Sequence, residues 1–123
     1  MRVRPARAGE RATVLSVLDA AMLETDADRV ADRITDDAAL VAVVDGRVLG
    51  ALVATPGTDG ATVEAVAVRP RRRGGGVGTA LVEAAGDRWG RLVADFDPGV
   101  RSFYESLGFR VTRTGERCRG VRD

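Results

Sequence analysis

A glycine-rich turn between an apolar strand and an amphipathic helix constrains the fold of this chain more than any other feature of its sequence. The apolar run 61–68 ends before Pro70, and three arginines at positions 71–73 lead into four glycines within the next five positions. Glycine lacks the Cβ atom that would keep a ligand away from the main chain. The helix that follows points its free N–H groups and its positive dipole end at the same place, so the turn predicts a site for an anion such as a phosphate.

The spacing of apolar residues predicts the remaining elements of a mixed α/β fold. Helical spacing is found over 10–23, 26–34, 76–89 and 98–107. Apolar and β-branched runs predict strands over 2–5, 40–44, 48–55, 61–68 and 92–94, followed by a hairpin over 109–118. Asp45-Gly46 is a strong hairpin signal between the second and third strands. Because the chain has 123 residues, we expect a single domain spanning residues 1–123.

The lack of histidine and lysine, together with a single cysteine, excludes several reaction classes. No Ser-His-Asp or Cys-His triad, no zinc site of ordinary spacing and no internal disulfide can form, so we expect no metal. A Walker A loop needs a lysine, which the chain lacks. A dinucleotide-binding fingerprint would place its glycines after the first strand of a parallel unit, whereas this turn follows the fourth expected strand, so both kinds of phosphate site are disfavoured. Cys118 is most simply a small apolar packing residue.

Charge and hydropathy restrict the partners and the location. The net charge is +1, and no apolar run approaches the roughly 20 residues of a membrane helix. The N-terminus lacks the apolar core of a signal peptide, so we expect a cytoplasmic protein with no membrane partner. The arginines around the turn form a short run without interleaved aromatic residues, so we expect no nucleic-acid partner.

Two blocks of the sequence resemble the GCN5-related N-acetyltransferase (GNAT) superfamily. Residues 73–78, Arg-Gly-Gly-Gly-Val-Gly, fit its cofactor motif, in which Arg or Gln, two variable residues, Gly, one variable residue and Gly or Ala surround the pyrophosphate of acetyl-CoA. Residues 97–109 are similar to a second segment, in which Asn and then Ala precede Phe-Tyr and Leu-Gly-Phe. This chain departs from that segment at Asp97, where Asn is usual, and at Val100, where Ala is usual.

The resemblance implies both a fold and a cofactor site. The fold would be a central, mostly antiparallel twisted sheet of six to seven strands, splayed at the cofactor site, with about four helices on its faces. Acetyl-CoA would be the co-substrate: the turn and the helix start would hold its diphosphate, and the strand before Pro70 would pair with its pantetheine arm. The cofactor-binding residues implied are Val66, Ala67, Val68, Arg73, Gly74, Gly75, Gly76, Val77, Gly78, Thr79 and Asp97.

Tyr104, the one tyrosine of the chain, is the candidate general acid because it aligns with the family's proposed acid. A phenol with a pKa of about 10 stays protonated at neutral pH and can donate to a departing thiolate whose thiol has a pKa of about 8.5. From the residues alone, Tyr104 could equally be a core aromatic packed beside Phe103 and Phe109.

Glu64 is the candidate general base. It lies four residues before Val68 in the same expected strand, so a period of two places both side chains on one face, toward the active-site groove. Through a water, Glu64 could take a proton from an ammonium substrate or simply attract its positive charge. The other interpretation is a carboxylate in solvent at a strand edge.

These observations predict an enzyme, an N-acetyltransferase that moves acetyl from acetyl-CoA directly to a primary amine of a small molecule or protein. The alternative is a catalytically inactive acyl-CoA-binding sensor or regulatory module. The acceptor stays open: the acid-rich segment 24–37 could draw an amine-bearing cation or form a solvated helix face. The segment 117–123 could pair with a second chain in a homodimer.

Overall fold

The computed structural model describes residues 1–20, 26–72 and 74–123. Residues 21–25, which include the end of the first expected helix, and Arg73, an expected cofactor contact, lie outside the described part of the chain. Within that part there are seven strands: β1 (Arg2–Pro5), β2 (Ala39–Val44), β3 (Arg47–Gly57), β4 (Gly60–Val68), β5 (Leu92–Phe96), β6 (Arg110–Thr114) and β7 (Arg117–Arg122). The helices described are α1 (Arg11–Ala20), α2 (Ala27–Thr35), α3 (Val77–Trp89) and α4 (Arg101–Ser106), with short 3-10 helices at Ala8–Glu10, Pro70–Arg72 and Pro98–Val100.

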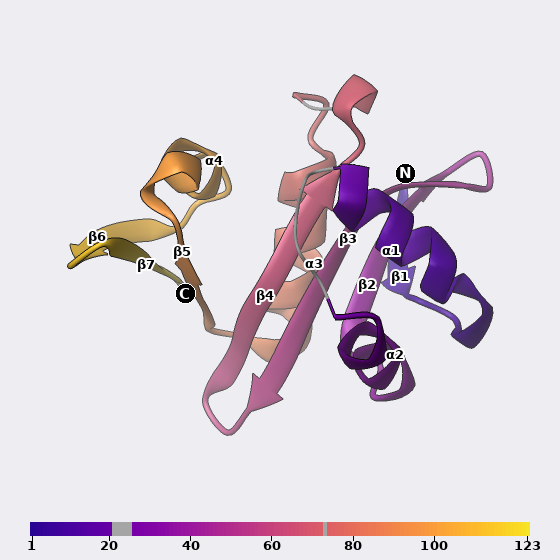
Figure 1. The fold of residues 1–123 in the computed structure, drawn as a ribbon, viewed down its shortest axis with the longest axis horizontal. Helices are drawn as coiled ribbons and strands as arrows, with labels where there is room; N and C mark the ends of the chain where they lie inside the picture. Colours follow the sequence, from indigo (N-terminus) through magenta and orange to yellow (C-terminus); the bar gives the residue numbers. More distant parts are fainter. Residues whose placement is uncertain (21–25, 73) are drawn as a thin grey trace.

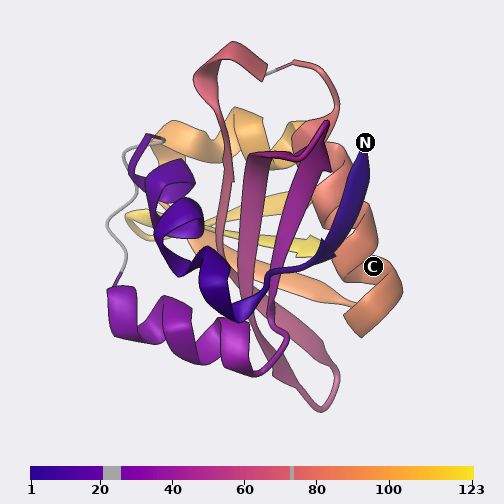
Figure 2. The same ribbon diagram turned by 90° about the vertical axis from the view of Figure 1, so that its right-hand side faces the viewer.

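The seven strands form one mixed sheet in the order β1-β2-β3-β4-β5-β7-β6. Every neighbouring pair in it is antiparallel except β4 and β5, which run parallel. Helices α1 and α2 cover one face of the sheet and α3 covers the other (Figures 1 and 2). This arrangement confirms the expected fold of a mostly antiparallel sheet with helices on both faces.

Local sequence signals set several of the element boundaries. Asp26 is the N-cap of α2, and its carboxylate accepts hydrogen bonds from the N–H groups of Asp28 and Arg29. Between β2 and β3, Asp45 and Gly46 both have positive φ, 51° and 79°, as a two-residue hairpin turn requires. These two signals are visible in the sequence, and the expected elements are found close to their predicted positions.

The core has two layers, one on each side of the sheet. Val66 and Val68 pack with Leu81 of α3, whereas Ala65 and Ala67 pack with residues of α1 and α2. Cys118 belongs to the α3 layer and is fully buried, as expected of an apolar packing residue. None of the helices in the described ranges is long and apolar enough to span a membrane.

Strands β4 and β5 separate soon after they begin. Their parallel pairing is limited to Ala61 with Leu92 and Thr62 with Val93, and β5 then runs away from β4 toward α4 (Figure 1). Gly60 permits the close start of this pairing, because a Cβ there would lie 1.9 Å from the carbonyl oxygen of Arg91. The expected splay of the sheet therefore begins at Val63.

The C-terminal strand differs from its predicted role. β7 pairs with β5 on one side and with β6 on the other, so its ladder is complete within the chain. The prediction that the segment 117–123 pairs with a second chain is therefore wrong for this strand. The outer strand at this end of the sheet is β6, and a homodimer through another surface stays a prediction.

Candidate active site

The glycine turn forms a concave start to α3. Gly74 and Gly76 have φ of 81° and 83°, in the left-handed region that residues with a Cβ rarely adopt. Gly76 is the N-cap of α3, and the first bond of the helix runs from the N–H of Ala80 to the carbonyl of Gly76 (3.0 Å). The three preceding N–H groups, of Val77, Gly78 and Thr79, therefore have no acceptor within the helix and point out of its start. This is the anion-binding geometry that the sequence predicts.

A pocket of about 350 Å³ opens at this helix start. Its lining includes six of the predicted cofactor-binding residues: Val68, Gly74, Gly76, Val77, Gly78 and Thr79. Phe103, Ser106 and Leu107 close the opposite side, so the two sequence motifs, far apart in the chain, meet here. Arg72 also lines the pocket and supplies a positive charge beside the turn. The pocket suits a phosphate-bearing ligand with an apolar arm.

Gly78 shows why glycine is needed where the two motifs meet. A Cβ at this position would lie 3.1 Å from Cδ2 of Leu107 and 3.6 Å from Cγ2 of Val68. The missing side chain lets the first turn of α3 pack closely against both β4 and the end of α4. Gly75, by contrast, is exposed and is not among the residues that line the pocket.

Along β4, the main-chain N–H and C=O groups of alternate residues point toward β3 and away from it. The N–H of Arg69 donates to the carbonyl of Leu49 (2.8 Å), which fixes the phase of the antiparallel ladder with β3. Hydrogen-bonded pairs alternate along such a ladder, so Ala67 turns its N–H and C=O toward β3. Val66 and Val68 direct theirs away from β3. Of the three predicted strand contacts, Val66 and Val68 have the orientation that an added chain would need.

Tyr104 is buried but keeps its hydroxyl accessible. Its ring stacks on Phe96, with ring centroids 4.0 Å apart, and meets Phe103 and Phe109 edge-on. The hydroxyl has no hydrogen-bond partner in the described part of the chain, yet no buried side-chain polar atom described there is unsatisfied, so the hydroxyl reaches solvent. Burial raises the pKa of Tyr104, which keeps the phenol protonated at neutral pH. The ring is a core aromatic, as one interpretation predicts. The role of the hydroxyl as the general acid stays a prediction.

Asp97 has a structural use that the motif did not indicate. Its carboxylate accepts a hydrogen bond from the N–H of Gly99 (2.8 Å) and caps the 3-10 helix Pro98–Val100 that leads into α4. It is not among the residues that line the pocket at the start of α3. Its contact with the cofactor stays a prediction.

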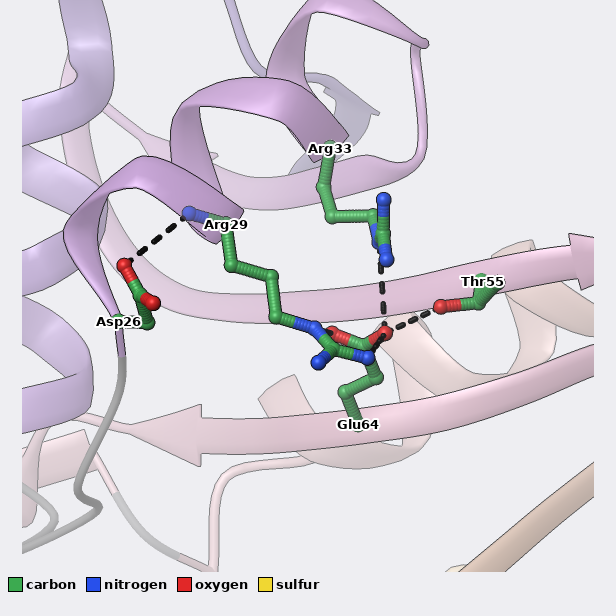
Figure 3. Close-up of polar contacts among 5 residues, drawn as sticks. All are labelled: Asp26, Arg29, Arg33, Thr55 and Glu64. Atoms are coloured by element: carbon green, nitrogen blue, oxygen red, sulfur yellow. Dashed lines mark hydrogen bonds and ion pairs between the residues drawn. The ribbon is translucent and has the colours of Figure 1, made fainter.

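Glu64 lies in a charged cluster on the other face of the sheet (Figure 3). Arg29 of α2 binds it with two hydrogen bonds, Nε to Oε2 (3.1 Å) and a terminal nitrogen to Oε1 (2.9 Å). Nε of Arg33, one turn later, lies 3.3 Å from Oε1, and the hydroxyl of Thr55 donates to the same oxygen. Partial burial raises the pKa of Glu64. The hydrogen bonds from Arg29 and Thr55 and the charges of both arginines lower the pKa, and together they outweigh the effect of burial. The net effect is a lowered pKa.

The prediction that Glu64 and Val68 face the same side of β4 is wrong, because β4 contains a β-bulge. Opposite β3, the pairs Val53–Ala65 and Ala54–Val63 leave Glu64 as an extra residue. The extra residue shifts the alternation, so Glu64 faces α2 whereas Val68 packs toward α3. Whether Glu64 acts as a base stays a prediction.

Arg29, Arg33 and Thr55 are absent from the predicted site. The sequence signal available was the pair of arginines four residues apart on one helix, which places them on the same side of α2. Asp28, Asp32, Asp36 and Asp37 are exposed, as in a solvated helix face, and the arginines are the charges that α2 presents to β4.

A family model described as an acetyltransferase (GNAT) domain matches residues 35–111, more than half of the chain. The chain belongs to the GNAT acetyltransferase family. The matched region of this GNAT protein contains β4, the turn, α3 and α4, and therefore the whole pocket. It begins at the last residue of α2, so Arg29 and Arg33 lie outside it. No curated protein sequence matches the chain.

Solved structures with the same fold include two whose names give different acceptors. PaiA N-acetyltransferase from Thermoplasma acidophilum in complex with coenzyme A has a TM-score of 0.85 at 14% identity, over 99% of this chain and 98% of its own. Ribosomal-protein-alanine N-acetyltransferase from Brucella melitensis has 0.71 at 19%, over 99% of each chain. Diaminobutyrate acetyltransferase EctA from Paenibacillus lautus, in complex with its substrate and coenzyme A, has 0.72 at 13%, over 98% and 92%. At these identities the likeness shows the fold of this GNAT protein and leaves its acceptor open.

Proposed function

We propose that this protein is an enzyme that transfers the acetyl group of acetyl-CoA directly to a primary amine of a small molecule or a protein. The observation that carries the proposal is the pocket at the start of α3, where the glycine turn and α4 meet beside the open side of β4. Family membership and the coenzyme A bound to PaiA, a protein of the same fold, support acetyl-CoA as the co-substrate.

The residues of the pocket suit the separate parts of acetyl-CoA. The free N–H groups of Val77, Gly78 and Thr79 would hold the diphosphate, with Arg72 adding charge. Arg73 completes the family motif but lies outside the described residues. The main-chain groups of Val66 would pair with an amide of the pantetheine arm as an added strand does, and those of Val68 have the same orientation along β4. Such anchoring fixes the reacting groups in place, which is a large part of what acetyl transfer requires.

Two side chains would move protons. Acetyl-CoA supplies an activated acetyl thioester: a C–N bond forms to the amine and the C–S bond breaks. The hydroxyl of Tyr104 would give its proton to the departing sulfur, and its raised pKa keeps that proton in place until then. Glu64, directly or through a water, would take the first proton that the acceptor's ammonium must lose. The nitrogen loses its second proton as the amide forms, and that proton restores the hydroxyl of Tyr104, directly or through solvent.

We expect no acyl-enzyme on a cysteine, because Cys118 is the one cysteine of the chain and is fully buried in the core. Acetylated Cys118 that passes its acetyl group on, detected by mass spectrometry, would contradict direct transfer.

Incubation with acetyl-CoA and a panel of primary amines tests the function. We expect acetylated amine, measured by mass spectrometry, in amounts equal to the free coenzyme A formed. Acetyl-CoA that binds but stays intact with every amine would instead show the sensor or regulatory module. Acetyl-CoA that does not bind at all would contradict both.

A further inference from the structure

Glu64 lies where β4 and β5 begin to separate, at the closed end of the opening in which the proposed reaction would place the pantetheine arm. The last residues to pair between the two strands are Thr62 and Val93. Glu64 follows two residues later, as the extra residue of the bulge. Bulges often re-aim a side chain next to an active site. The proposal below rests on the proposed function, because it concerns the acceptor of that reaction.

The residues around Glu64 occupy both oxygens of its carboxylate with hydrogen bonds. Arg29 takes both of its oxygens, and Arg33 and Thr55 share Oε1. A carboxylate that neutralises two guanidinium groups holds a further proton weakly, because protonation would break these charge-assisted bonds. Glu64 therefore cannot serve as an effective base until at least one partner leaves.

Arg29 is the partner free to leave. Its side chain is 58% exposed, whereas those of Arg33 and Glu64 are 19% and 18% exposed. Asp26, whose charge also acts on Arg29, already accepts hydrogen bonds from the N–H groups of Asp28 and Arg29. Two guanidinium groups thus share the single carboxylate of Glu64, and a second carboxylate arriving from solvent would find Arg29 at the rim of the cluster.

A pocket of about 200 Å³ lies next to the cluster. Thr55, which donates to Glu64, also lines this pocket, together with Asp59, Arg91 and the last strand pair, Thr62 and Val93. Its volume is below the roughly 300–1,000 Å³ of pockets for drug-sized ligands. It has room for a small polar molecule beside the point where the strands separate.

We propose that the acceptor is a small primary amine that carries a carboxylate, of the amino-acid type, and that this carboxylate replaces Glu64 on Arg29. Arg29 then binds the acceptor with two N–H···O bonds, and Glu64 is released from it. Glu64 takes one proton from the acceptor's ammonium, directly or through a water, which leaves the neutral amine that attacks the thioester. An amine without a carboxylate leaves Arg29 on Glu64 and is a poor acceptor.

Matched acceptors test the exchange: glycine against glycinamide, and glutamate against its α-amide, each with acetyl-CoA. The carboxamides have the more acidic ammonium groups and so more neutral amine at pH 7, so intrinsic reactivity favours them. We expect kcat/KM to be at least tenfold higher for the carboxylates, the worth of one charge-assisted hydrogen bond. In Arg29→Ala the ratio should fall to one or below, and in Arg29→Lys part of the preference for carboxylates should remain. Arg88→Ala, an exposed arginine on α3 at the opposite face, should leave it unchanged.

The state of Glu64 gives a second readout that does not need turnover. With carboxyl-labelled glutamates, and Glu64 assigned through Glu64→Gln, its pKa can be followed by NMR while N-acetylglycine or N-acetylglycinamide is added. We expect N-acetylglycine to raise the pKa of Glu64 in the unmodified protein but not in Arg29→Ala, and N-acetylglycinamide to leave it unchanged in both.

The outcomes separate this proposal from the proposed function. Acetyl transfer with equal kcat/KM for carboxylates and carboxamides, or a Glu64 pKa that ignores N-acetylglycine, would overturn the exchange and leave the acetyltransferase intact. Failure of acetyl-CoA to bind would overturn the function, and the NMR titration would still decide whether Arg29 exchanges carboxylates.

Discussion

Thr79→Glu should weaken acetyl-CoA binding while leaving the fold as stable as before or slightly more stable. Thr79 is exposed, lines the pocket and lies in the first turn of α3, so its replacement needs no repacking. A glutamate in the first turn of a helix gains roughly 0.3–1 kcal/mol from the helix dipole. The same carboxylate, about 5 Å from a phosphate charge at an effective dielectric of 20, costs the complex about 3 kcal/mol, and about half of that once solvent screening is included.

Calorimetric titration with acetyl-CoA at fixed ionic strength measures the loss, which corresponds to a Kd about 10- to 100-fold higher. Thermal unfolding of the free variant checks that it is folded. Arg88→Gln is the matched control, since it makes the same change in net charge on the same helix. It lies about 13 Å further along the axis, beyond the screening length of about 8–10 Å. A folded Thr79→Glu variant that binds acetyl-CoA as tightly as the unmodified protein would refute the anion site.

Substitutions at Tyr104, at Gly60 with Gly57 as its control, and at Glu10 have expected outcomes. Tyr104→Phe should lower kcat by about 100-fold or more at unchanged KM for acetyl-CoA and nearly unchanged melting temperature, because it removes the proton and keeps the ring; unchanged kcat would leave Tyr104 a packing residue. Gly60→Ala should cost more than about 3 kcal/mol in chemical unfolding, because φ is 135° and its Cβ would lie 1.9 Å from a carbonyl oxygen, whereas Gly57→Ala, with its nearest contact at 3.7 Å, should cost less than about 1 kcal/mol. The hydrogen bond from Arg4 lowers the pKa of Glu10 to about 2 from an ordinary 4.5, so Glu10 stabilises the fold above pH 4.5 and loses this effect as the pH falls toward 2. Glu10→Gln should accordingly lower the melting temperature at pH 7 and make no difference near pH 2.

The elements of the fold were predictable because their signals are local. Asp45-Gly46 needs only its own two positive φ angles to turn a hairpin, and Asp26 needs only the two N–H groups that it caps. The anion site was predictable for the same reason, since a glycine turn and the helix start that follows are contiguous in sequence.

Features that depend on distant strands were not predictable. The bulge at Glu64 exists only in the pairing of β4 with β3, and nothing in the strand's own alternation marks the extra residue. The position of β7 inside the sheet depends on strand order, which local pattern does not encode. The contact of Arg29 and Arg33 with Glu64 joins α2 to β4, more than 30 residues apart, so the helix could be read from its sequence but its partner could not.

The most direct test of the central claim is an amide NMR titration of this 13.0 kDa protein with acetyl-CoA. We expect a single saturable transition in which the amides of residues 74–79, of Val66 and Val68, and of the α4 side of the pocket shift together. The amides around the separate groove between α1 and α2, such as Ala12 and Ala31, should stay in place. Shifts centred on that groove, or a turn whose amides do not respond to acetyl-CoA, would contradict acetyl-CoA binding at the start of α3.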